Sequence, residues 1–246
     1  MGNLRSFALL ALGFAPALLH AAAYQVVVEV QDPRGKPFAE PAQKLCEEWY
    51  PKFNEALFGP DYELPFKEVK VIFEGEIVFQ NGKDRVVIPA YTDGNTIHVN
   101  SKYTAEFHKR APNDYLGMVA HELAHVVQHY ENGAAAGWLV EGIADYVRHK
   151  YYEKDIEPRL HLDAKGNLMG MELGRNKGEF ATQGYLAGYT VAGAFLDWLE
   201  VRKDSDIVPT LSRALRGNRY TDALFQSRCG ASLEDLWGGF VEQSKK

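Results

Sequence analysis

Cysteine is nearly absent from this sequence. Cys46 and Cys229 are the two among 246 residues, and no Cys-x-x-Cys pair occurs. This scarcity excludes a disulfide-rich scaffold and a structural zinc site built from cysteine pairs. Basic residues are also outnumbered, 27 against 33 acidic ones, and the net charge of −6 argues against nucleic acid as a partner and against a polybasic membrane face. After residue 23 there is no apolar run long enough to span a bilayer.

The first 23 residues have the pattern of a secretory signal peptide. Arg5 precedes an apolar run from Phe7 to Leu19, and a small-residue cleavage pattern follows at residues 21–23. This run is too short for a spanning helix, although a retained membrane anchor is the alternative. We therefore expect a secreted or periplasmic protein that has no stable membrane association after cleavage, with residues 24–246 forming a single domain.

The order of the expected elements predicts an α+β domain, with a small twisted N-terminal sheet followed by a mostly helical part. A helix is expected over residues 40–58, and short β-branched runs predict strands at 24–30, 69–73, 76–79, 85–88 and 96–99. Residues 153–183 lack apolar periodicity and are expected to form a loop beside the cleft. In an oxidising compartment, Cys46 and Cys229 are candidates for one disulfide that links the two ends of the domain.

The most specific pattern is His121-Glu122-x-x-His125. Because a helix turns about 100° per residue, both imidazoles lie on one face and reach a single metal ion. Zinc held in this way keeps a position open for water, lowers the pKa of that water to about 7, and leaves Glu122 placed to take its proton. A separate core-facing stripe supports the helix: Leu116, Ala120, Leu123, Val127 and Tyr130. The alternative is a pair of surface histidines on an ordinary helix.

A third ligand is expected from the segment 138–148. Glu141 and Asp145 are one helical turn apart, and Glu141 would complete a His2Glu zinc site. Asp145 is expected to accept the second ring N–H of a ligand histidine, and it is the first substitute if Glu141 is not the ligand. Alternatively, the two carboxylates lie on a solvated face and pair with Arg148 and Lys150.

Attack on an amide also requires a donor to the developing oxyanion. Tyr185 and Tyr189 are spaced i and i+4 in an apparent helix with many small residues, so either phenol is a candidate. The alternative is that both are ordinary core aromatic residues with satisfied hydroxyls.

Five segments resemble the basic secretory protein family, which is described as peptidases of plants and bacteria among the thermolysin-like zinc metallopeptidases, or gluzincins. These segments are residues 90–100, 121–128, 138–148, 188–200 and 232–240. The resemblance implies a zincin-like fold, zinc held by His121, His125 and Glu141, and Glu122 as the general base. It favours Tyr189 as the oxyanion donor, since the pair Gly188-Tyr189 is the part that matches.

By analogy with related zincins, the resemblance also assigns substrate binding by strand addition to Thr96, Ile97, His98, Val99 and Asn100. The family's name refers to basic proteins, whereas this chain has a pI near 5.8.

We therefore expect a secreted zinc-dependent metallopeptidase that acts on protein or peptide substrates. No G-x-M-x-N exopeptidase block is present, which favours an endopeptidase. Two alternatives stay open: a binding or defence-type protein that retains the zinc site, and a zinc hydrolase of non-peptide amides or esters. A purely structural zinc site would be closed by four protein ligands and would have no use for Glu122, which favours the peptidase. The oligomeric state is not readable from the sequence.

Overall fold

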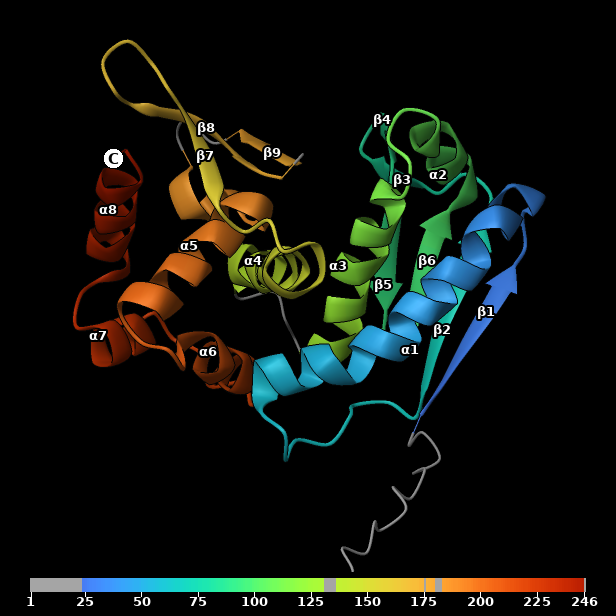
Figure 1. Cartoon of the computed structure of the whole chain (residues 1–246), viewed down its shortest axis with the longest axis horizontal. Coiled ribbons are helices and arrows are strands. Elements are labelled where there is room, and N and C mark those ends of the chain that lie inside the picture. The colour runs from blue at the N-terminus through green and yellow to red at the C-terminus, as the bar shows by residue number, and fades with distance from the viewer. Residues whose placement is uncertain (1–23, 131–135, 175, 180–182, 246) are drawn as a thin grey trace, which may run out of the picture.

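The first half of the chain forms a four-stranded sheet covered by a long helix. The computed structural model describes residues 24–130, 136–174, 176–179 and 183–245, so the expected signal peptide lies outside the described residues. The strand order is β1 (Gln25–Val30), β2 (Glu68–Glu74), β6 (Thr96–Asn100), β5 (Ala90–Asp93). The first three strands are parallel, and β5 is the antiparallel edge. A parallel pair needs a crossover, which α1 (Lys36–Phe58) supplies between β1 and β2 (Figure 1).

The alternation of β2 decides which face of this sheet is buried. Val69, Val71 and Phe73 are fully buried, while the residues between them are partly or fully exposed. The chain enters α1 through Gly35, where an added Cβ would lie 2.5 Å from Phe73 Cβ. A side chain there would force the start of α1 away from the sheet, so glycine permits the close packing of the two layers.

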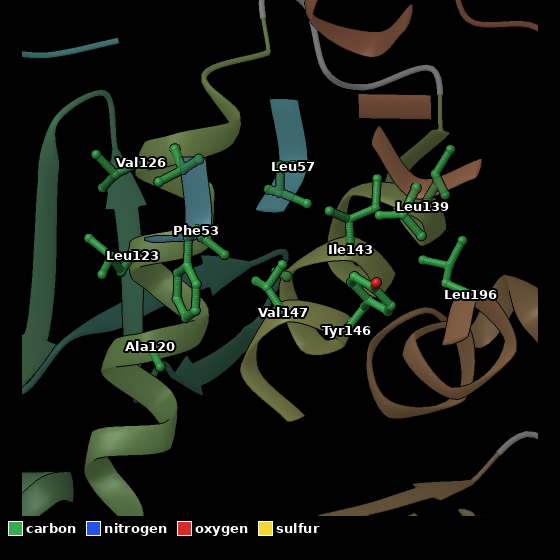
Figure 2. Close-up of a cluster of buried hydrophobic side chains, with 14 of the residues drawn as sticks. Phe53, Leu57, Ala120, Leu123, Val126, Leu139, Ile143, Tyr146, Val147 and Leu196 are labelled. Carbon is green, nitrogen blue, oxygen red and sulfur yellow. The ribbon is translucent and has the colours of Figure 1, made fainter. Parts of the chain in front are cut away.

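Four helices pack against one another in succession. α1 packs against α3 (Asp114–Gln128), α3 against α4 (Gly137–Val147), and α4 against α5 (Tyr189–Arg202). Figure 2 shows Leu123 of α3 near Phe53 of α1, and Leu196 of α5 facing α4. At the crossing of α4 and α5, a Cβ on Gly142 would lie 2.4 Å from Ala192 Cβ. The small residue therefore allows α5 to approach α4 closely, and this approach fixes where the N-terminus of α5 lies.

The remaining described elements complete a mixed α+β fold. β3 (Val78–Asn81) and β4 (Asp84–Val87) form a hairpin before β5, and α2 (Ser101–His108) precedes α3. After α4 the chain forms a π-helical turn, η3 (Arg148–Glu153). The last helices are α6 (Ile207–Arg216), α7 (Ala223–Cys229) and α8 (Leu233–Ser244). The expected order, with a small sheet first and mostly helices after it, is confirmed.

Residues 153–183 are not the irregular loop that the composition predicted. The segment contains an antiparallel sheet of β7 (Pro158–Leu162), β8 (Leu168–Leu173) and β9 (Asn176–Glu179). Met171 and Leu173 of β8 are buried in the core, which anchors the sheet. None of the three strands contains a β-branched or aromatic residue, so the sequence pattern did not indicate them.

Cys46 and Cys229 are both free thiols, so the expected disulfide is not formed. Cys46 is fully buried in α1, where burial raises the pKa of its thiol to about 12, whereas Cys229 ends α7 in a partly exposed position. Along the described part of the chain, no helix combines the length and hydrophobicity needed to cross a membrane.

Candidate metal centre and active site

Helix α3 places His121 and His125 one turn apart with their Nε2 atoms 3.1 Å from each other. Glu141, on α4, brings its Oε2 to 3.2 Å from His121 Nε2 and 3.5 Å from His125 Nε2. An ion with tetrahedral bonds of 2.0–2.1 Å separates its ligand atoms by about 3.3 Å. The three atoms therefore have the mutual spacing of three zinc ligands.

The Nδ1 atoms of both histidines are hydrogen-bonded, and these bonds explain why the two Nε2 atoms and the Glu141 oxygen suit a cation. His121 Nδ1–H donates to Asp145 Oδ1 at 2.7 Å, and His125 Nδ1–H donates to Gln128 Oε1 at 2.7 Å. The Gln128 amide is itself oriented, because its Nε2 donates to the Val140 carbonyl at 2.8 Å. With both Nδ1 atoms protonated, each neutral ring directs its Nε2 lone pair at the other ring and at the Glu141 carboxylate. A positive charge between these atoms would relieve this repulsion.

Without a metal, a proton supplies this charge. Burial alone would lower the pKa of His121, but the carboxylates of Asp145 and Glu141 outweigh burial and raise that pKa to about 10. Burial alone would likewise raise the pKa of Asp145, but His121 lowers it to about 2. Glu141 follows the same pattern, its pKa being lowered by the two histidines against the effect of burial. The arrangement therefore favours a positive charge between these groups, for which a proton and a metal ion would compete.

Glu122 is held at the wall of the same cleft by the edge strand. Its side chain is 7% exposed, and Thr92 Oγ1 of β5 lies 2.8 Å from Glu122 Oε2 and 2.9 Å from the Glu122 carbonyl oxygen. This hydroxyl ties α3 to β5 and orients the carboxylate that was predicted as the general base. The cleft has a volume of about 920 Å³ and is lined by β5, α3, α4 and the start of α5.

The two tyrosines differ in position. Tyr189 is the first residue of α5, lines the cleft, and stacks on His121 with ring centroids 5.8 Å apart. Partial burial, with the carboxylates of Glu141, Glu122 and Asp145, raises the pKa of Tyr189 to about 12, so its phenol keeps its proton at neutral pH.

Tyr185 packs away from His121, His125 and Glu141. It belongs to the 3₁₀ turn η4 (Gly184–Ala187), contacts the rings of Trp138 and Trp237, and donates to Glu234 at 3.4 Å. The expectation of one helix carrying both tyrosines is wrong, because Gly188, with φ of 69°, separates η4 from α5.

The segment predicted to take an added substrate strand lies inside the sheet. Thr96, Ile97, His98, Val99 and Asn100 form β6, which pairs with β2 on one side and β5 on the other. Both edges of β6 are already used, so strand addition there is excluded. The edge strands of this sheet are β1 and β5 among the described residues, and it is β5 whose residues line the cleft next to Glu122.

Arg148 links the site to a second group of charged side chains. It lies 3.9 Å from Asp145 and donates twice to Glu153, at 2.9 and 3.0 Å. Beyond it, buried His149 pairs with Asp155 at 2.7 Å and with Glu153 at 3.2 Å. These are the spacings of hydrogen-bonded ion pairs, so the group stabilises the C-terminal end of α4 and the turn that follows it.

Lys150 does not pair with Glu141 or Asp145 but with Asp197 and Glu200. The alternative of a solvated carboxylate pair on α4 is therefore not what the structure shows, since Asp145 is 3% exposed and both carboxylates face the histidines of α3.

A comparison with protein families identifies the relatives of this chain. The model of the BSP family, described as peptidase of plants and bacteria, matches residues 58–240. The chain belongs to this family. The BSP-family match includes every site residue described above and begins at the last residue of α1. A comparison with curated proteins found no match.

Two residues of this BSP-family site were not predicted from the sequence. Gln128 is three residues after His125, and this spacing puts both side chains on one helix face. The spacing is the sequence feature from which their hydrogen bond could have been predicted. Thr92 lies in the segment 90–100 that carried the resemblance, but its contact with Glu122 joins a strand to a helix 30 residues away. Nothing in the local pattern indicates such a contact.

Proposed function

We propose that this protein is a zinc-dependent peptidase with a zincin-like fold of the gluzincin type. The observation that carries the proposal is the convergence of two histidine lone pairs and the Glu141 carboxylate beside a second carboxylate, Glu122, in an open cleft. Membership of a family described as peptidases supports the same activity.

In this proposal His121, His125 and Glu141 hold the metal, and Asp145 and Gln128 keep the two rings oriented. Zinc bound there supplies a water that ionises near neutral pH and a Lewis acid for the substrate carbonyl. Glu122 takes the proton of the attacking water and returns it to the leaving amine. Tyr189, protonated at neutral pH, donates to the oxyanion that develops on the carbonyl oxygen.

The substrate we infer is an extended peptide that pairs with the free edge of β5. An added strand would form main-chain hydrogen bonds with residues 90–93 and would bring its carbonyl groups past Glu122. Since strand pairing does not require a chain end, it favours cleavage within a chain, which agrees with an endopeptidase. Secretion or transfer to the periplasm is part of the proposal and rests on the pattern of residues 1–23.

The test is digestion of an unfolded protein by the purified chain lacking residues 1–23. Three samples are compared: the zinc-loaded protein, the protein after exhaustive chelation, and the chelated protein after zinc is returned. We expect cleavage in the first and third samples only, with internal fragments identified by mass spectrometry. Undiminished cleavage after complete metal removal would refute zinc dependence, and absence of cleavage at full zinc occupancy would refute the peptidase.

A further inference from the structure

One end of the cleft is apolar. Phe79 of β3, Ile88 and Pro89 before β5, and Met118 of α3 line the cleft together. Met118 lies about one turn before His121 and Glu122 on α3, so this end of the cleft adjoins the proposed reaction site. Figure 1 shows the β3–β4 hairpin beside this N-terminal end of α3.

Phe79 is exposed but held in place. Phe79 is one of the large hydrophobic residues at the surface, and it is 48% exposed. The ring contacts Tyr91 edge to face at 5.4 Å, and Tyr91 stacks on His98 at 4.5 Å with an interplanar angle of 4°. His98 is in turn hydrogen-bonded to Glu74 of β2. Because side chains alternate along β5, Tyr91 lies on the face of the strand away from Thr92 and Glu122. This row of contacts thus holds the exposed ring of Phe79 on that face, at the edge of the cleft.

The charged groups next to this end are already paired. Arg148 lines the cleft, but Glu153 accepts two hydrogen bonds from its guanidinium. A neighbouring cavity of about 640 Å³ shares Pro89, Met118 and Arg148 with the cleft, and its carboxylates, Glu153 and Asp155, pair with Arg148 and His149. These acidic groups therefore offer little uncompensated charge to a basic side chain.

We propose that Phe79, with Ile88 and Pro89, forms a subsite for one bulky apolar side chain, such as Phe, Leu or Met, of the peptide that is cleaved. The inference rests on the proposed peptidase. A peptide paired with β5 directs alternate side chains to opposite faces, so a side chain near the cleaved bond that points away from Glu122 faces Phe79. Because even one methylene changes discrimination in an apolar pocket by roughly 10- to 200-fold, Phe or Leu should be preferred to Ala by at least about 10-fold in kcat/KM.

The experiment measures kcat/KM for peptides of one sequence in which each position around the cleaved bond is changed in turn to Phe, Leu, Ala, Lys or Glu. The zinc-loaded wild type is compared with Phe79→Ala, Phe79→Leu and Val87→Ala. Val87 is the matched control because it is equally exposed, at 47%, and lies on the same hairpin. It pairs with Val78, whereas Phe79 pairs with Val86, so Val87 lies on the other face of the hairpin.

We expect one position at which the wild type has a higher kcat/KM for Phe and Leu than for Ala. This preference should fall about 10-fold in Phe79→Ala and be largely restored in Phe79→Leu. It should be unchanged in Val87→Ala. Cleavage with no preference, or with a preference for Lys or Glu, would overturn the subsite while the peptidase stands.

A binding measurement separates the two failures. Binding of the same peptides to zinc-loaded Glu122→Gln is followed by fluorescence anisotropy. Tighter binding of the Phe peptide that depends on Phe79 would support the subsite even if no peptide were cleaved. Binding that is equal for all peptides, with no cleavage, would overturn both proposals.

Discussion

Replacing Gln128 with alanine tests how His125, one of the proposed metal ligands, is oriented. The Gln128 side chain accepts from His125 Nδ1 at 2.7 Å and donates to the Val140 carbonyl at 2.8 Å, and the residue is 1% exposed. Alanine would leave the partly buried Nδ1–H of His125 and the partly buried Val140 carbonyl without these partners, and the His125 ring would lose the contact that fixes its tautomer. An unsatisfied buried group costs about 1–3 kcal/mol.

Loss of a hydrogen bond to the outer nitrogen of a metal-bound histidine typically weakens metal affinity by about 10- to 100-fold. We therefore expect Gln128→Ala to bind zinc in that range more weakly, measured by competition with a chromophoric chelator. Gln128→Glu keeps the acceptor for His125 but loses the donor to Val140, so its zinc affinity should lie nearer to wild type than that of the alanine variant.

The control is Gln43→Ala, a partly exposed residue of α1 that bonds only to Glu47 among the described contacts. It should leave zinc affinity unchanged. The unfolding temperature of each metal-free variant shows whether the fold itself is affected. If Gln128→Ala is stably folded and binds zinc as tightly as wild type, the proposed orientation of His125 is refuted.

Three further results are expected. Glu141→Ala should lose zinc in metal analysis, and full occupancy would place the third ligand elsewhere. Tyr189→Phe should keep zinc but lose about 10²- to 10³-fold in kcat, while an unchanged kcat would remove Tyr189 from the reaction. The pKa of His121 is raised from 6.5 to about 10, so its positive charge stabilises the metal-free fold. This contribution to the free energy of unfolding is complete below pH 6.5 and is lost as the pH rises toward 10. Zinc binding at pH 8 should therefore release at least one proton, measured by calorimetry in buffers of different ionisation enthalpy, and no release would contradict this pKa.

The parts of the site that follow from local periodicity were predictable. His121 and His125 lie on one face because of helix geometry, and Glu141 and Asp145 follow the same rule on α4. The structure brings both pairs together. The mixed fold was predictable from the order of β-branched and helical patterns.

The parts that depend on tertiary contacts were not predictable. β5 is only four residues long and lies beside β6 at a tight turn, so the sequence did not show which of the two strands has the free edge. The helix expected to carry both Tyr185 and Tyr189 is broken by the conformation of Gly188, whose Cβ would lie 3.5 Å from Glu141 Cβ. This is an ordinary van der Waals distance, so the positive φ of Gly188, and not crowding against α4, marks where α5 begins.

The most direct test of Glu122 as the base compares wild type with Glu122→Gln at equal, measured zinc occupancy on one unfolded protein substrate. Glutamine is nearly the same size and still accepts from Thr92, but it cannot take a proton from water. Cleavage by the wild type and a loss of several orders of magnitude in Glu122→Gln are expected. Equal cleavage by both proteins would show that Glu122 is not the base and would contradict the proposed mechanism.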